Sequence, residues 1–167
     1  MPAASFERGG NAGGSAAGGI VVNDGRLLMI RQRRPYGSYW EFPSGYYEPG
    51  ESFEQTTARE VMEETGIDVE VGELVCTMVW ERVHDMRRNV LAYFLATPIE
   101  PAAEPRAQVE EDIEDARFVD PSELDVDEIH SLHRAILARW WRTRTTGFHV
   151  YADVTVEPDG TQSYAFR

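Results

Sequence analysis

Residues 45–67 combine strong helix signals with an unusual concentration of acidic side chains. Ser52 is followed three residues later by Gln55, which makes a capping box, and Gly66 is a typical left-handed terminator of a helix. We therefore expect a helix over roughly residues 53–65. Because both of its ends are specified locally, this helix constrains the fold strongly.

The acidic residues of this helix fall on one side of it. At about 100° per residue, setting Glu60 at zero places Glu64 near ~40° and Glu63 near ~−60°. The apolar and small residues occupy a different arc: Ala58, Val61, Met62 and Thr65. Carboxylates three and four residues apart repel one another, so a helix that needed only solubility would carry Lys or Arg among them. A bound hard cation would explain the crowding.

An irregular loop is expected immediately before the helix, over residues 43–51. Four residues that interrupt regular structure lie there: Pro43, Gly45, Pro49 and Gly50. Such a loop would lead into the positively polarised N-terminus of the helix.

Together, the loop and the helix resemble a known family motif, the Nudix box. The pattern is Gly, five residues, Glu, seven residues, Arg-Glu, an apolar residue, any residue, Glu-Glu, any residue, Gly and an apolar residue. This chain fills all nine constrained positions without a gap: Gly45, Glu51, Arg59, Glu60, Val61, Glu63, Glu64, Gly66 and Ile67. Such a match is far more specific than a short glycine motif. Residues 16–32 and 40–43 are also similar to the family, so the resemblance spans roughly residues 16–142.

The resemblance implies a Mg²⁺-dependent pyrophosphohydrolase that cleaves a phosphoanhydride bond. The substrate would be a nucleoside diphosphate linked to another moiety, such as a nucleoside triphosphate, ADP-ribose or a nucleotide sugar. Mg²⁺, or Mn²⁺ as an alternative, binds a few carboxylates and leaves positions for water and phosphate. Glu60 and Glu64 are the expected ligand pair, with Glu63 as the third carboxylate. Either Glu60 or Glu63 could take the proton from the attacking water, and the sequence does not choose between them.

Three further residues of the loop and helix have expected roles. Arg59 is expected to pair with Glu51 and lock the loop against the helix, so that it acts in catalysis through positioning. Many family members have Gly-Gly where this chain has Ser44 and Gly45, and the carbonyl of the first of the pair is often a metal ligand. Ser44 has that carbonyl too, so we expect it to bind the metal, with Gly45 and Glu51 orienting the loop.

The family commonly takes another carboxylate from a distant loop. Residues 109–119 are strongly acidic and lead into a strand that is expected to return beside the site. Glu111 and Glu114 are the candidates, and we rank Glu114 first as a metal ligand. A merely solvated acidic loop is the alternative.

Basic and aromatic residues near the box are candidates for substrate binding. Arg31 and Arg33 follow the second expected strand, where phosphates would approach, although surface pairing with the many acids is an equal alternative. Tyr47, in the polar loop, is the expected stacking residue for a base. Trp40 and Phe42 are expected in the core instead.

The composition narrows the class of partner. The 167 residues carry a net charge of −13, and all 16 basic residues are Arg, which indicates codon bias in a GC-rich bacterial genome. The negative charge disfavours binding to nucleic acid or anionic membrane. No apolar run could span a bilayer, and residues 1–19 lack the apolar core of a signal peptide. The single cysteine, Cys76, is expected to be a buried structural thiol. We expect a cytoplasmic protein that binds a nucleotide-type small molecule.

The whole pattern predicts an α/β fold, with a mixed β-sheet between α-helices and a C-terminal β-hairpin extension. The six expected strands are residues 20–22, 27–32, 69–71, 74–82, 90–97 and 116–119. A second helix is expected at about residues 127–142, decorated by His130 and His133, which show no metal-site spacing.

Three segments are expected along the chain. They are a flexible Gly- and Ala-rich arm over residues 1–15, the Nudix domain over 16–142, and the hairpin extension over 143–167, with strands at 148–156 and 161–166. Because a hairpin alone is marginal in water, it should pack on the domain or on a second subunit in a homodimer.

Two other functions share the expected fold. A catalytically silent Nudix-like module that senses a nucleotide is the main alternative, and the intact set of Glu60, Glu63 and Glu64 argues against it. Isomerisation of an isoprenoid diphosphate relies on a catalytic cysteine, for which Cys76 in an apolar strand is poorly placed.

Overall fold

The computed structural model describes residues 13–167, which contain nine strands and two α-helices. The strands are β1 (Ser15–Asn23), β2 (Arg26–Arg34), β3 (Gly37–Glu41), β4 (Ser44–Tyr46), β5 (Val69–Arg82), β6 (Arg88–Pro98), β7 (Ile113–Val119), β8 (Phe148–Val156) and β9 (Gln162–Phe166). The helices are α1 (Phe53–Thr65) and α2 (Ser131–Trp140), and short 3₁₀ turns cover Val109–Glu111, Pro121–Glu123 and Val126–Glu128.

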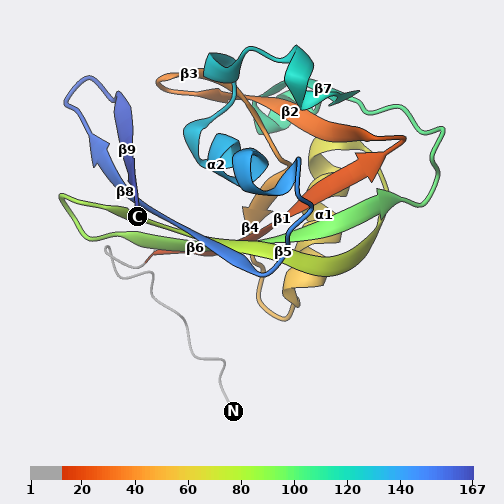
Figure 1. Ribbon diagram of the computed structural model, residues 1–167, viewed down its shortest axis with the longest axis horizontal. Coiled ribbons are helices and arrows are strands. Elements are labelled where there is room, and N and C mark those ends of the chain that lie inside the picture. Colours follow the sequence, from red (N-terminus) through yellow and green to blue (C-terminus); the bar gives the residue numbers. More distant parts are fainter. Residues whose placement is uncertain (1–12) are drawn as a thin grey trace.

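All nine strands belong to one mixed sheet, as predicted. The order is β3-β2-β1-β6-β5-β8-β9, with β4 paired to β1 and β7 paired to β2. β1 runs parallel to β6 and β5 runs parallel to β8, whereas the other pairs are antiparallel. The sheet curls so that α2 lies between β2 and β3 on one side and β5, β6 and β8 on the other (Figure 1).

The two helices pack on opposite faces of the sheet. Successive side chains of a strand point to opposite faces, and β1 shows the result directly. Ile20 joins a core cluster with the α2 residues Leu132 and Ile136, while Val21 joins a second cluster with Val61 of α1. The predicted arrangement of a sheet between helices is therefore confirmed.

Helix α1 has the bounds that its capping residues predict. The Ser52 hydroxyl accepts the Gln55 N–H, and the Gln55 side chain accepts the Ser52 N–H at 2.8 Å. Gly66 ends the helix in the left-handed region at φ 72° and donates its N–H to the Met62 carbonyl. Met62 departs from the expected apolar arc, since it is exposed, whereas Val61 is buried.

The loop before α1 is less irregular than expected. Ser44–Tyr46 forms β4, which pairs with residues 16–18 of β1. A Cβ on Gly18 would collide with Ser44, so the glycine allows this close approach. β3, which no sequence signal indicated, pairs with β2. β3 thus forms a tight hairpin with the strand before it, whereas β4 depends on a partner more distant in the sequence.

Other boundaries differ in a similar way. The segments expected at 69–71 and 74–82 form one strand, β5, whose pairing with β6 shifts register between them. The strand expected at 116–119 starts at Ile113, because its first residues pair with β2.

Helix α2 is shorter than predicted and begins at Ser131. His130 is its N-cap, and its Nδ1 accepts the Leu132 N–H. Ile129 forms a bridge with Trp40 of β3, which keeps the preceding residues extended. The expectation that His130 and His133 decorate the surface of this helix is wrong, because both are buried.

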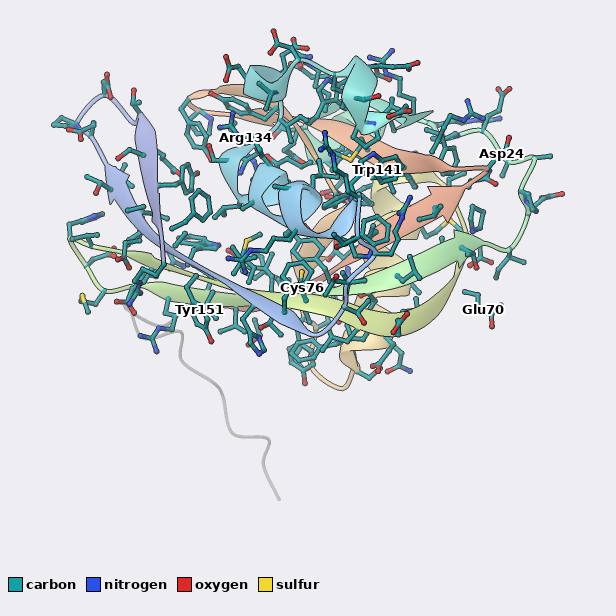
Figure 2. The ribbon with its side chains drawn as sticks, viewed as in Figure 1. Asp24, Glu70, Cys76, Arg134, Trp141 and Tyr151 are labelled. Atoms are coloured by element: carbon teal, nitrogen blue, oxygen red, sulfur yellow. The ribbon has the colours of Figure 1, made fainter. Side chains whose placement is uncertain are left out.

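The C-terminal hairpin is present as predicted and extends the sheet. β8 pairs with β5, and its residues Val150, Ala152 and Val154 are buried. The expected flexible arm falls mostly on residues 1–12, which lie outside the described residues, and Ser15 already belongs to β1. None of the described helices is long and apolar enough to cross a membrane. Cys76 is buried on β5, on the side of the sheet that faces α2 (Figure 2).

Candidate functional site

Arg59 links the loop before α1 to the helix, as the sequence predicts. Its Nε donates to Glu51 Oε1 at 2.7 Å, and its Nη2 donates to Glu51 Oε2 and to the Tyr46 carbonyl. The hydrogen bond from Arg59 lowers the pKa of Glu51 to about 2. The Arg59 guanidinium therefore holds the loop against the helix at two points, Tyr46 and Glu51.

The same guanidinium holds two carboxylates of the acidic stripe. Arg59 Nη1 donates to Glu60 Oε1 at 2.7 Å and to Glu63 Oε2 at 2.9 Å. The three acids differ in exposure: the Glu63 side chain is 53% exposed, that of Glu60 is 13% exposed, and Glu64 is buried. The stripe is therefore graded from solvent to interior.

The ionised forms of the two inner carboxylates, Glu60 and Glu64, are destabilised by their surroundings. Burial raises the pKa of Glu60, and repulsion from Glu63 and Glu111 adds to it although Arg59 opposes it. Burial and repulsion from Glu60 raise the pKa of Glu64 well above its usual value. The Ser44 N–H donates to Glu64 Oε2 at 2.9 Å, so the main chain at Ser44 borders this carboxylate.

Gly45 provides the room that the inner carboxylates occupy. A Cβ at this position would overlap the carboxyl group of Glu60. The glycine is thus required by the close approach of β4 to α1. This gap, Ser44 and the three acids lie at the junction of β4 and α1.

This junction has the donor set that a hard cation prefers. In the part of the chain that the structure describes, no three acidic, cysteine or histidine side chains already converge as a metal site. Arg59 engages Glu60 and Glu63, while Glu64 faces the Ser44 main chain. Buried carboxylate oxygens with raised pKa values nevertheless fit Mg²⁺, which binds through oxygen and offsets negative charge.

The predicted distant carboxylate is engaged elsewhere. Glu114 pairs with Arg33 at 3.0 Å and lies 3.8 Å from Arg31, which also pairs with Glu128 at 3.1 Å. Glu111, by contrast, acts on Glu60 electrostatically. The structure therefore brings Glu111 toward the acidic stripe and places Glu114 in a surface ion-pair network with both predicted substrate-binding arginines.

Tyr47 lies apart from the cavity described below. Its ring packs against Phe53, with the centroids 6.5 Å apart, and its hydroxyl accepts the Gly50 N–H. The preceding residue, Tyr46, is the tyrosine of this loop that lines the cavity.

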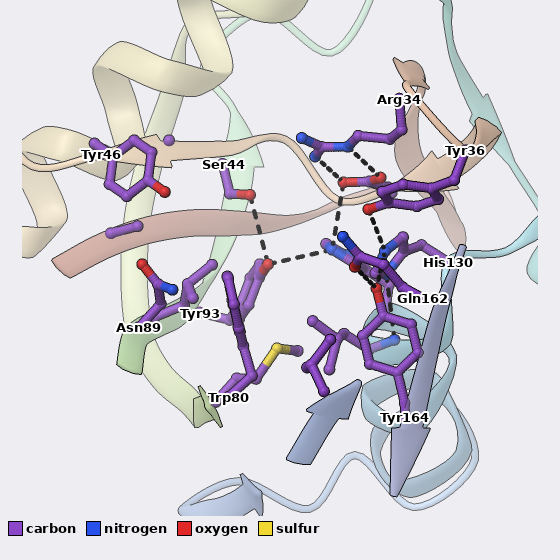
Figure 3. A pocket seen from close by; sticks show the side chains of 18 of the residues that line it. Arg34, Tyr36, Ser44, Tyr46, Trp80, Asn89, Tyr93, His130, Gln162 and Tyr164 are labelled. Atoms are coloured by element: carbon purple, nitrogen blue, oxygen red, sulfur yellow. Dashed lines mark hydrogen bonds and ion pairs between the residues drawn. The ribbon is translucent and has the colours of Figure 1, made fainter. Parts of the chain in front are cut away.

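A cavity of about 390 Å³ opens beside Ser44 and Gly45. Its walls come from β3, β4, β5, β6, α2 and the C-terminal hairpin (Figure 3). Aromatic and polar side chains dominate the lining, and they include Tyr36, Tyr46, Trp80, Asn89, Tyr93, His130, Gln162 and Tyr164. A cavity of this size and lining suits a small organic ligand with a planar ring.

A buried polar cluster that the sequence did not reveal forms the floor of the cavity. Arg34 binds both oxygens of Glu41, at 3.0 and 2.6 Å. Burial raises the pKa of Glu41, but the hydrogen bond from Arg34 and the electrostatic effects of His133, Arg34 and His130 together outweigh it, so the net pKa is lowered. His133 accepts the Phe42 N–H on Nδ1, and burial lowers its pKa to about 3, so its ring is neutral. In the sequence, the one sign of this cluster is Glu41, an acidic residue that stands between Trp40 and Phe42.

Comparisons with known proteins identify the family of the chain. Residues 14–140 match the family model described as the NUDIX domain. The chain is 33% identical over 99 residues to the NAD-capped RNA hydrolase NudC of Stutzerimonas stutzeri, which covers 59% of this chain and only 33% of that protein. It is 37% identical over 86 residues to the 8-oxo-dGTP diphosphatase of Proteus vulgaris, covering 48% of this chain and 73% of that protein.

The fold has solved counterparts as well. A NUDIX hydrolase from Nitrosomonas europaea superimposes with a TM-score of 0.71 at 21% identity, over 85% of this chain and 80% of that one. The likeness in structure shows the fold, and the family model spans most of the chain. This protein therefore belongs to the Nudix family.

Proposed function

We propose that this protein is a Mg²⁺-dependent hydrolase that cleaves a phosphoanhydride bond in a nucleoside diphosphate linked to another moiety. The observation that carries the proposal is the pair formed by the half-buried Glu60 and the buried Glu64 beside Gly45. Of these two charges, Arg59 offsets only that of Glu60, so Glu64, one helical turn away, still needs a cation or a proton. The named activities of the two relatives, on NAD-capped RNA and on 8-oxo-dGTP, support the reaction class and differ in substrate.

Glu60, Glu64 and the Ser44 carbonyl would hold the ion. Glu111 is the better candidate for the additional ligand, since Glu114 is held by Arg33. When bound, Mg²⁺ would neutralise phosphate oxygens and make a water molecule more acidic.

The remaining groups would position and deprotonate the water. With Glu60 and Glu64 as ligands, Glu63 is left to take the proton, because its half-exposed side chain has room for a water molecule beside it. Arg59 holds Glu63 and the loop in one geometry, so it acts as a positioning residue. The cavity beside Gly45 would hold the nucleoside part of the substrate.

A cysteine-based isomerase on the same fold is disfavoured. Burial raises the pKa of Cys76 to about 12, so this thiol carries no appreciable thiolate at neutral pH. Cys76 is also absent from the residues that line the described cavity.

A substrate panel tests the proposal. The wild-type protein is incubated with Mg²⁺ or with EDTA and with nucleoside triphosphates, dinucleotides, ADP-ribose and nucleotide sugars, and release of nucleoside monophosphate is followed. We expect turnover of at least one class with Mg²⁺ and none with EDTA. Tight binding of a nucleotide without turnover of any class would favour the silent sensing module instead.

A further inference from the structure

The C-terminal hairpin forms one wall of the cavity. β8 and β9 lie beyond residues 14–140, which match the family, yet Val154, Gln162 and Tyr164 all line the cavity (Figure 3). This wall is therefore added by a part of the chain outside the family match.

A chain of hydrogen bonds orients Gln162 within that wall. His130 Nδ1 accepts the Leu132 N–H, so the neutral ring carries its proton on Nε2. Nε2 lies 3.0 Å from the Tyr164 hydroxyl and donates to it, and Tyr164 in turn donates to Gln162 Oε1 at 2.6 Å. The oxygen of the Gln162 amide is thus occupied, and its NH₂ group is the part that remains for a ligand.

Asn89 repeats this arrangement on the opposite side of the cavity. It is only 2% exposed, and its Oδ1 accepts the Gly14 N–H at 2.9 Å. Its Nδ2 is buried and has no hydrogen-bond partner among residues 13–167. A buried donor without a partner is costly and rare, which points to an acceptor supplied by a ligand.

The cavity therefore offers two amide donors, from Gln162 and Asn89. The carboxylate in its wall, Glu41, already has both oxygens bound by Arg34. Aromatic rings of Tyr46, Trp80 and Tyr93 provide flat apolar surface nearby. A planar heterocycle with carbonyl oxygens satisfies these donors, whereas an exocyclic amino group would face donors with its own hydrogens.

We propose that Gln162, held by Tyr164 and His130, acts with Asn89 to select substrates whose base carries a carbonyl group in place of an amino group. The inference rests on the proposed function, because it takes the cavity to be the seat of the nucleoside. The hairpin is then a specificity element, and Gln162 and Asn89 are specificity-determining residues outside the metal-binding stripe.

Matched nucleotide pairs test the selection. Inosine and adenosine triphosphates differ at one ring carbon, carbonyl against amino, and in the hydrogen on the adjacent ring nitrogen, and uridine and cytidine triphosphates differ in the same way. We measure kcat/KM with Mg²⁺, and the affinity for the corresponding monophosphates without metal by calorimetry. One of the two pairs should bind more tightly than the other. Within that pair, the nucleotide with the carbonyl group should be preferred over the one with the amino group by about tenfold or more, in both kcat/KM and affinity.

Variants of the hairpin assign the preference to Gln162. Gln162→Glu replaces the amide NH₂ with an oxygen, so it should abolish or reverse the preference, through a higher KM for the carbonyl member of the pair. Ser163→Ala, at an exposed position of the same strand, is the matched control and should keep the wild-type preference. Tyr164→Phe keeps the ring but removes the hydroxyl that holds the Gln162 amide, so it should weaken the preference through KM. If Gln162→Glu fails to fold, Tyr164→Phe tests the role of Gln162 in its place.

The outcomes separate the two proposals. If the wild-type protein neither turns over any nucleotide nor binds any monophosphate, the proposed function fails. If it is active but shows no preference within the pairs, the selection by amide donors is overturned while the function stands. The same holds if Gln162→Glu, or Tyr164→Phe in its place, behaves like Ser163→Ala.

Discussion

Glu64 illustrates how its surroundings change what a carboxylate can do. It is buried and lies one turn from the half-buried Glu60, and burial and repulsion raise the pKa of each. Arg59 offsets the charge of Glu60, whereas Glu64 receives a hydrogen bond from the Ser44 N–H. Without a cation, its ionised form is therefore a source of instability in the folded protein.

Glu64→Gln should stabilise the metal-free protein at neutral pH. A carboxyl group whose folded pKa is raised costs nothing at a pH below its unfolded value, and the cost grows as the pH rises from there through the folded value. Gln does not titrate, so the variant should gain about 1–2 kcal/mol at pH 8 and almost nothing near pH 4. Thermal unfolding in EDTA at both pH values measures the difference.

Glu63→Gln is the matched control, because the Glu63 side chain is half exposed. Its effect on unfolding should be small at both pH values. A Glu64→Gln protein that is no more stable than wild type at pH 8 would show that the ionised Glu64 side chain does not destabilise the folded protein. Added Mg²⁺ should raise the melting temperature of wild type more than that of the variant.

At the scale of elements, Arg59 joins the loop to α1. Its planar fork meets Glu51 through two nitrogens and also reaches the Tyr46 carbonyl. Lysine keeps the charge but cannot reproduce these contacts. The geometry at the junction of β4 and α1 therefore depends on arginine itself.

Arg59→Lys should lower kcat by roughly tenfold to a hundredfold, because small misplacements of catalytic groups are costly. The Mg²⁺ concentration that gives half-maximal activity should change far less, since Glu60 and Glu64 remain. Arg26→Lys, at an exposed position, controls for the substitution. A large rise in the Mg²⁺ requirement with unchanged kcat at saturation would show that Arg59 serves metal binding instead.

The elements that the sequence predicts well are those with local signals. α1 has its expected bounds because Ser52, Gln55 and Gly66 specify them within the segment. β3 and β4 were not predicted, since they form by pairing with β2 and β1. Six of the nine box positions lie at the junction of the loop and α1, whereas Val61 and Ile67 pack in the core and Gly66 ends the helix.

The parts of the site that the sequence does not predict depend on distant contacts. His130 and His133 are buried because α2 packs inside the curled sheet, which helical spacing alone does not show. The choice between Glu111 and Glu114 depends on which acid Arg33 binds. The cavity wall formed by Gln162 and Tyr164 depends on how β8 adds to β5.

At the scale of the whole molecule, the hairpin is part of the central sheet. Val150 and Ala152 of β8 belong to the same core cluster as Trp140 of α2 and Met78 of β5. The hairpin and the rest of the described chain should therefore unfold together, in one cooperative transition.

Val150→Ala should lower the stability of the whole protein by about 2 kcal/mol, because it leaves a gap in the shared core. The melting temperature should fall by roughly 4–8 °C, still in a single transition. Thr155→Ala, at an exposed position of β8, should have a smaller effect. Calorimetry that showed a separate low-temperature transition for Val150→Ala would indicate that the hairpin unfolds by itself.

In the proposed function, Glu60 and Glu64 hold the Mg²⁺ ion required for phosphoanhydride cleavage. The most direct test compares wild type with Glu64→Gln on the best substrate of the panel, over a range of Mg²⁺ concentrations. We predict that the variant remains folded, loses at least about a hundredfold in kcat/KM, which corresponds to roughly 2.7 kcal/mol, and needs more Mg²⁺. Equal turnover by the two proteins at every Mg²⁺ concentration would contradict the account.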